Sequence, residues 1–299
     1  FNSKFPSNKI SLSVFADDNQ TIFPKNSSIQ DIAGELNASV SGESLFRLNK
    51  NYRNTQQIAE FSRYFQLTGK KSTEIPFGNN GKKPVVDFVD SYVNVIKKIV
   101  NRAQNKGKIK IGIIYFGHNF RGEISLKDIF NFLDEELESH PKIQLNRYMS
   151  NWKKFKDTQS INFQHQCSIT AVNQASAKGL EFDDVYVFGL ENMDIQDGNE
   201  IDIIKKLYVV SSRPRKRLTF VIKIDSNDLN LPDQIRIFPP SDRNLCEYTY
   251  EGSEFSEQLK EKLNNVDWLP SATDIMRNKP ETKEMVSRIC SLSKNDRIN

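Results

Sequence analysis

One stretch of the chain places a lysine, a glycine and several carboxylates directly before an apolar run. Residues 177–187 read AKGLEFDDVYV, in which Lys178 and Gly179 precede Glu181. A glycine has no Cβ and lets the backbone approach a bound group closely. The apolar residues that follow have the length of a strand. The stretch therefore predicts a ligand-facing loop that leads into a buried strand.

A second stretch lies about one helix further along the chain and ends in an arginine. Residues 207–213 read LYVVSSR, and Pro214 follows. Proline restricts the residue before it and cannot continue a helix, so we expect a helix to end close to Arg213. An arginine at a helix end can stabilise the charge that develops on a phosphate during its transfer. The alternative is a surface arginine in a basic cluster, because residues 215–217 read RKR.

Four segments, in the same order, resemble motifs of superfamily 1 helicases of the UvrD/Rep kind. Residues 177–187 are similar to motif V and residues 207–213 to motif VI. Residues 15–23 (FADDNQTIF) resemble motif III, and residues 48–54 (LNKNYRN) resemble motif IV. The resemblance implies the second motor domain of an ATP-dependent DNA helicase or translocase. It also implies an α/β fold of the RecA-like, P-loop NTPase type.

The order of the elements favours the same fold class. Runs of strand length alternate with amphipathic helices, which predicts a parallel sheet with helices on both faces. We expect residues 1–40 to be a remnant of the first motor domain and residues 41–225 to form the second RecA-like domain. Residues 226–299 are expected to form a mainly helical C-terminal extension. The family's phosphate loop precedes motif III, and its pattern does not occur here, so the chain is expected to begin just after it.

The resemblance implies that three residues act on the terminal phosphate of ATP. Arg213 would stabilise transition-state charge, Arg53 would make a second phosphate contact, and Gln20 would sense the phosphate from the first-domain side. The implied cofactors are ATP and Mg²⁺. The ligands of the metal are expected in the first motor domain, and no metal-binding residue is expected in this chain.

Three further residues are implied to hold the rest of the nucleotide. Tyr52 would lie against the adenine, because an aromatic face covers a planar base, although it could instead be a core aromatic. Glu181 would accept a hydrogen bond from the ribose, and the alternative is a solvated carboxylate. Gly179 would allow the backbone to approach.

Contacts with single-stranded DNA are implied for Phe23, Lys25, Ser176 and Lys178. The relatives stack bases on aromatic rings and follow the phosphates with polar and basic groups. Two positions depart from the family, because Lys25 stands where relatives carry a tryptophan and Ala175 where they carry a histidine. A base–aromatic stack contributes roughly 1–3 kcal/mol, so these departures bear on strand separation more than on ATP turnover.

The composition is compatible with a helicase domain and indicates the cellular compartment. The formal net charge of the 299 residues is +4, which is compatible with a polyanionic partner. Three widely separated cysteines suggest neither a disulfide framework nor a zinc site, so the cytoplasm is the expected compartment. No apolar run approaches membrane-spanning length, and no membrane partner is expected.

The expected partners are single-stranded DNA and the first motor domain. A rival interpretation is a non-catalytic helicase-like scaffold or a regulatory nucleic-acid-binding module. A third is a DNA-bound ATPase that translocates without unwinding.

Overall fold

A seven-stranded parallel sheet forms the centre of the protein. The structure is a computed structural model that describes residues 14, 29–36, 50–67, 75–76, 78–117, 124–148, 165–193, 200–225, 230–252 and 257–272. The strand order is β5-β6-β4-β7-β8-β3-β9, and each neighbouring pair is parallel. The strands are β3 (Val85–Val89), β4 (Ile109–Tyr115), β5 (Gln144–Tyr148), β6 (Cys167–Asn173), β7 (Phe182–Phe188), β8 (Pro214–Lys223) and β9 (Glu247–Tyr250).

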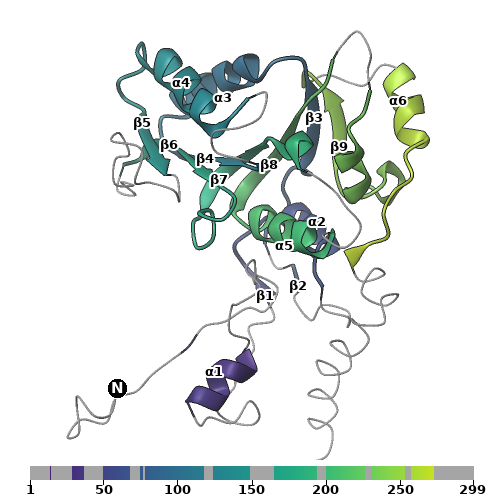
Figure 1. Cartoon of the computed structure of the whole chain (residues 1–299). Helices are drawn as coiled ribbons and strands as arrows, with labels where there is room; N and C mark the ends of the chain where they lie inside the picture. The colour runs from purple at the N-terminus through teal and green to yellow at the C-terminus, as the bar shows by residue number, and fades with distance from the viewer. Residues whose placement is uncertain are drawn as a thin grey trace, which may run out of the picture.

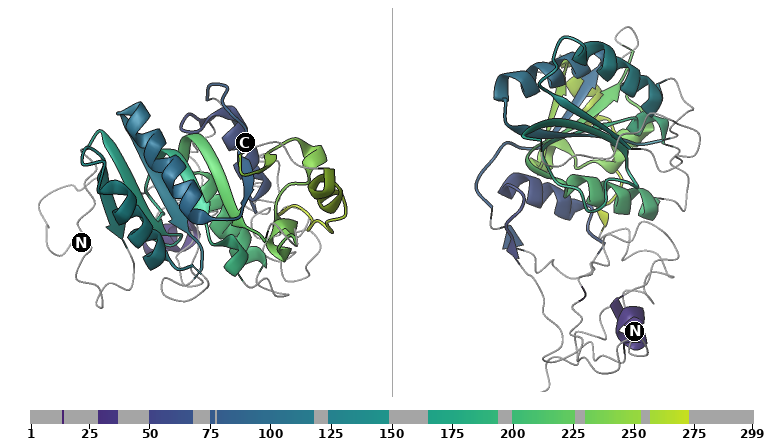
Figure 2. Two further views of the ribbon diagram at one scale, coloured as in Figure 1. Left: turned by 90° about the horizontal axis from the view of Figure 1, so that it is seen from above. Right: turned by 90° about the vertical axis from the view of Figure 1, so that its left-hand side faces the viewer.

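Helices cover both faces of this sheet (Figure 1 and Figure 2). On one face lie α3 (Tyr92–Lys106) and α4 (Leu126–Leu137), and on the other lie α2 (Gln56–Tyr64) and α5 (Glu200–Ser211). Each face has its own cluster of buried apolar side chains. The expected α/β arrangement, a parallel sheet between two helical layers, is confirmed and fits the RecA-like class.

The remaining elements are short. They are α1 (Ile29–Glu35), β1 (Lys50–Asn51), β2 (Ile75–Pro76), η4 (Leu190–Asn192), η5 (Asp233–Ile237), η6 (Ser241–Arg243) and α6 (Glu257–Asn264). The strands β1 and β2 pair with each other in parallel, apart from the main sheet. None of the helices in the described ranges is long and apolar enough to cross a membrane.

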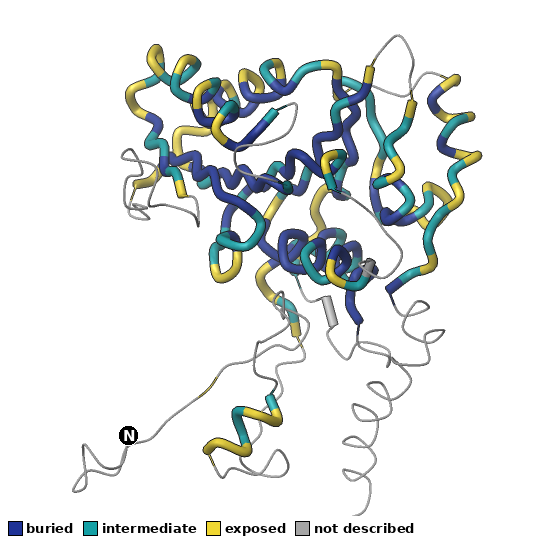
Figure 3. The backbone as a smooth tube through the Cα atoms, in the orientation of Figure 1, coloured by how far each residue is buried: buried dark blue, intermediate teal, exposed yellow. Residues whose placement is uncertain are grey.

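Local sequence explains the central elements well. Every residue of β6 is buried, as is usual for a central strand of a parallel sheet covered on both faces (Figure 3). Helix α4 begins at a serine cap, where the Asp128 amide donates to Ser125 Oγ at 3.3 Å. The Ser125 amide donates back to the Asp128 carboxylate at 2.7 Å, which completes a capping box. These hydrogen bonds from Ser125 hold the pKa of Asp128 below its ordinary value.

The connection between β6 and β7 contains no helix. Residues 174–181 run from the carboxyl end of β6 to the amino end of β7, and both strands flank β4. Ala177 within this crossover is buried, and the Phe182 ring at its end packs against Gly112 of β4. A Cβ on Gly112 would lie 2.5 Å from a ring carbon of Phe182, so this position requires glycine. The carboxyl end of β6 and the amino end of β7 are thus joined by one short segment.

Two strands of the seven-stranded sheet were not expected from the sequence. One is β5, which lies in a stretch that reads as polar, and the other is β9, which follows residue 225. Because β9 pairs with β3, residues after 225 also contribute a strand to the main sheet. The sequence also predicts a strand at residues 10–16, of which the structure describes residue 14 alone, and a helix at residues 279–292, which lies outside the described residues.

A buried ion pair ties α3 to the sheet, and it can be tested. Asp184 of β7 is fully buried, and its carboxylate accepts from Arg102 Nε. Arg102→Gln should lower the free energy of unfolding by about 3 kcal/mol, because it leaves a buried carboxylate uncompensated. Asp184→Asn should cost less, since an amide is cheaper to bury than a charge. Urea unfolding of both variants measures this.

The matched control for this pair is Arg236→Gln. Arg236 bonds to Asp267 at 3.1 Å at an exposed position, so its loss should cost no more than about 1 kcal/mol. Equal losses for Arg102→Gln and Arg236→Gln would contradict the structural role given to Arg102.

Candidate functional site

The amino ends of β7 and β8 bring the two functional stretches side by side. Phe182 is in register with Pro214, and the Phe182 amide donates to the Arg213 carbonyl at 3.2 Å. Glu181 and Arg213 therefore lie next to each other where the adjacent strands β7 and β8 begin. This site is at one end of the sheet, on the edge formed by the amino ends of these strands. The segment at residues 50–55 reaches the same edge, where the Thr55 amide donates to the Arg215 carbonyl at 3.2 Å.

A buried asparagine fastens that segment to the edge. The Asn54 side-chain amide donates to the Ser212 carbonyl at 3.3 Å and also to the Pro214 carbonyl. Its Oδ1 accepts from Asn51 Nδ2 at 2.8 Å. The sequence interpretation overlooked both asparagines, although their spacing around Tyr52 and Arg53 was a usable signal. The Asn54 side chain thus joins two of the resembled motifs, IV and VI.

Two arginines bind the same glutamate at this edge. Arg53 Nε lies 2.7 Å from Glu181 Oε1, and Arg215 Nη2 lies 2.8 Å from Glu181 Oε2. Burial alone would raise the pKa of Glu181, but the hydrogen bond from Arg215 and the charges of Arg53, Arg215 and Arg213 outweigh it and lower the pKa. The structure brings the predicted Arg53 and Glu181 together and adds Arg215.

Arg213 lies deeper than its neighbours. Only 2% of the residue is exposed, and its Nε donates to the Val209 carbonyl at 2.8 Å. Its Nη2 donates to Ser212 Oγ, also at 2.8 Å. These bonds hold the guanidinium at the end of α5, so Arg213 is not the surface arginine of the alternative interpretation. Its charge still acts on Glu181.

The crossover carries the other predicted residues of this stretch. Gly179 has a φ of +86°, which favours glycine, and an added Cβ would meet nothing within 4 Å. Lys178 beside it is exposed. Ser176 is half-buried, and its amide donates to Asn173 Oδ1 at 2.9 Å at the carboxyl end of β6. At position 179, glycine is therefore needed for its backbone conformation, and the space beside its Cα is open to a ligand.

Four predicted site residues remain. The structure describes one of them, Tyr52. Tyr52 is 66% exposed, so it is not a core aromatic. Gln20, Phe23 and Lys25 lie outside the described residues. The described part of the chain holds no group of three or more His, Cys, Asp or Glu residues arranged for a metal ion.

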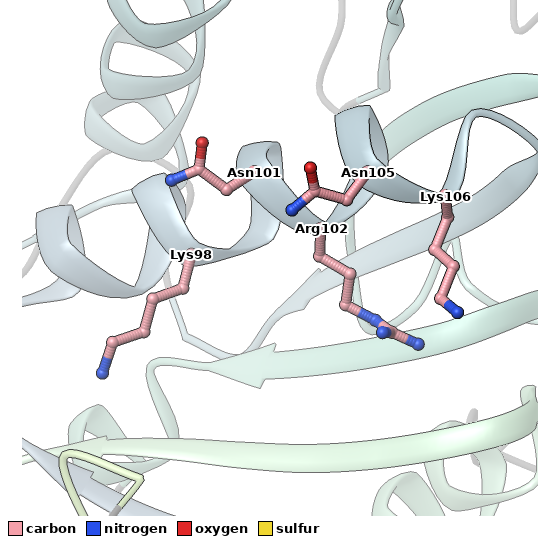
Figure 4. Close-up of a pocket in the computed structure, with 5 residues that line it drawn as sticks. All are labelled: Lys98, Asn101, Arg102, Asn105 and Lys106. Atoms are coloured by element: carbon pink, nitrogen blue, oxygen red, sulfur yellow. The ribbon is translucent and has the colours of Figure 1, made fainter.

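A polar groove on α3 lies on the other face of the sheet from α2. Its lining residues come from one stretch of that helix: Lys98, Asn101, Arg102, Asn105 and Lys106 (Figure 4). Two of its cations already have acidic partners, because Lys98 bonds to Glu251 and Arg102 to Asp184. The groove therefore has less free charge than its composition suggests, and the edge at Glu181 remains the candidate site.

Comparisons of this chain with known proteins found similar solved structures. No family model matches the sequence, and no curated protein matches it. The chain is similar to the C-terminal domain of a possible DNA helicase from Lactobacillus plantarum WCFS1, with 18% identity over 66% of this chain and 98% of that one and a TM-score of 0.41. It is also similar to the NS3-like helicase from Alongshan virus, with 10% identity over 73% of this chain and 66% of that one and a TM-score of 0.29.

The role of Asn54 can be tested by a change that keeps its shape. Asn54→Asp removes the two N–H donors and sets a carboxylate against the carbonyls of Ser212 and Pro214. We expect the free energy of unfolding to fall by about 3 kcal/mol, because buried acceptors and a charge are left unpaired. Asn101→Asp, at an exposed position of α3, should change it by no more than about 0.5 kcal/mol. Similar values for the two variants would show that Asn54 does not fasten this edge.

Proposed function

We propose that this chain is the second motor domain of an ATP-dependent superfamily 1 DNA helicase or translocase. The observation that carries the proposal is the meeting of residues 50–55, Glu181 and Arg213 at one edge of the sheet. These segments resemble motifs IV, V and VI, and they are far apart in the sequence. Their convergence places three arginines and one carboxylate together, which is a cationic environment suited to phosphates.

In this proposal the chain forms one wall of an ATP site. Arg53 and Arg213 face the terminal phosphate, and the exposed ring of Tyr52 covers the adenine. The first motor domain supplies the phosphate loop, the ligands of Mg²⁺ and Gln20. The bound metal neutralises phosphate charge. The residues of this chain orient the nucleotide and stabilise the charge that develops when the phosphate is transferred.

Single-stranded DNA is proposed to bind near the other end of the crossover. Ser176 lies close to the carboxyl end of β6, while Glu181 lies at the amino end of β7. Lys178 is exposed between them and can follow a phosphate. Residues 174–181 thus link a DNA contact to a nucleotide contact through one short segment, so that a shift at either end is felt at the other.

The first test of this function concerns Arg213. In the full-length protein that carries this chain, Arg213→Ala should lower DNA-stimulated ATP turnover by roughly 10³–10⁵-fold, the range that such an arginine supplies in phosphoryl transfer. Arg213→Lys should restore little, because an ammonium lacks the planar fork that meets two oxygens. DNA affinity should change little.

Because Arg213 also bonds to Val209 and Ser212, the unfolding free energy of each variant is measured as a control. A folded Arg213→Ala variant that keeps more than about a tenth of the rate would favour the non-catalytic scaffold instead.

The second test concerns Lys178. Lys178→Gln should weaken binding of an oligothymidylate and should reduce the slope of log affinity against log salt concentration by about 0.7, the value for one lost phosphate contact on a single strand. Fluorescence anisotropy at several salt concentrations measures both quantities. Lys142→Gln, at another exposed lysine, is the control and should leave the slope unchanged. Identical slopes for the two variants and the wild type would remove Lys178 from the DNA path.

A further inference from the structure

Arg215 has no role in the family resemblance, yet it shares a carboxylate with Arg53. The two guanidinium groups bind opposite oxygens of Glu181, at 2.7 and 2.8 Å. Their side chains are 41% and 56% exposed, and that of Glu181 is 31% exposed. A solute can therefore reach all three groups from the edge of the sheet.

The chemistry of the pairing indicates what could replace the carboxylate. A guanidinium offers a planar fork of N–H donors that meets two oxygens of a carboxylate or of a phosphate equally well. A carboxylate held between two such groups occupies the place where phosphate oxygens would bind. Partly exposed ion pairs of this kind contribute only about 0–1 kcal/mol each, so a phosphate with more charge can displace them.

We propose that Arg215 is a further phosphate-binding residue and that Glu181 is the internal counter-ion that Arg53 and Arg215 exchange for the phosphates of a nucleotide. The identity of the ligand as a nucleotide rests on the proposed function above. The exchange also frees the carboxylate of Glu181 at the same place, where it can then accept a hydrogen bond from a ribose hydroxyl. Glu181 thus binds the two arginines when the site is empty and the ribose when the nucleotide is bound.

The neighbouring groups support this division of roles. The Asn54 side chain holds the segment of Arg53 by donating to the carbonyls of Ser212 and Pro214, so Arg53 can leave Glu181 by moving its side chain alone. Lys216, next to Arg215, bonds to Asp183 at 2.9 Å and is occupied elsewhere. Arg213 is buried and held at the end of α5, so it adds charge without taking part in the exchange.

The test compares tripolyphosphate with ATP, both without metal, by isothermal titration of the 299-residue chain. Tripolyphosphate carries the phosphates but neither base nor ribose. Glu181→Gln should strengthen tripolyphosphate binding roughly two- to tenfold, because two ion pairs no longer compete with the ligand. Arg215→Gln should weaken it by a similar factor. Arg236→Gln, which breaks an exposed pair with Asp267, is the matched control and should change nothing.

Several outcomes would overturn the inference. These are weaker tripolyphosphate binding by Glu181→Gln, unchanged binding by Arg215→Gln, or no binding by the wild type at millimolar concentration. Circular dichroism and urea unfolding establish that each variant is folded.

Failure of the proposed function gives a different result. The variants would then act on tripolyphosphate as expected, but ATP would bind no better than tripolyphosphate, and Tyr52→Ala would not matter. If ATP binds better and Tyr52→Ala removes that advantage while Arg215→Gln has no effect, the nucleotide site stands and the exchange is wrong.

Discussion

The parallel pairing of β7 with β8 is the constraint on which the candidate site depends. Because Phe182 and Pro214 are in register, the residues that precede them, Glu181 and Arg213, must lie at the same edge. Both strands are central, so this edge is anchored by the buried core of the domain. The segment of Asn54 then needs only a few hydrogen bonds to join them, and residues whose numbers differ by 158 and 160 meet there.

The helix-free crossover between β6 and β7 ends at the same edge. Parallel strands are usually joined by a dozen or more residues with a helix, whereas residues 174–181 pass over β4 directly. That path is possible because Gly112 leaves room for the Phe182 ring. Ser176 and Glu181 are thus joined by one short segment in which Ala177 is the buried residue.

The parts of the fold that could be predicted are those that local chemistry determines. The capping box at Ser125, the amphipathic α3 and the apolar β4 each carry their signal within a few residues. The strand β9 carries no such signal, because its pairing with β3 joins Val85 to Glu247, and β5 is a polar edge strand. Periodicity cannot reveal a partner that lies so far away in the sequence.

The candidate site divides in the same way. The motifs selected Arg53, Glu181 and Arg213 as candidate site residues, but the motifs could not predict the contacts of these residues with one another. Arg213 and Arg215 are two residues apart and have opposite environments, since one is buried and the other is more than half exposed. The turn between α5 and β8 sets this difference, and Pro214 fixes its direction. The buried guanidinium bonds to the end of its own helix and stays in place, while the exposed one bonds to a carboxylate that a stronger anion can replace. In the proposed exchange the empty site carries less net positive charge, because Glu181, which precedes the neighbouring strand β7, offsets one of its three arginines.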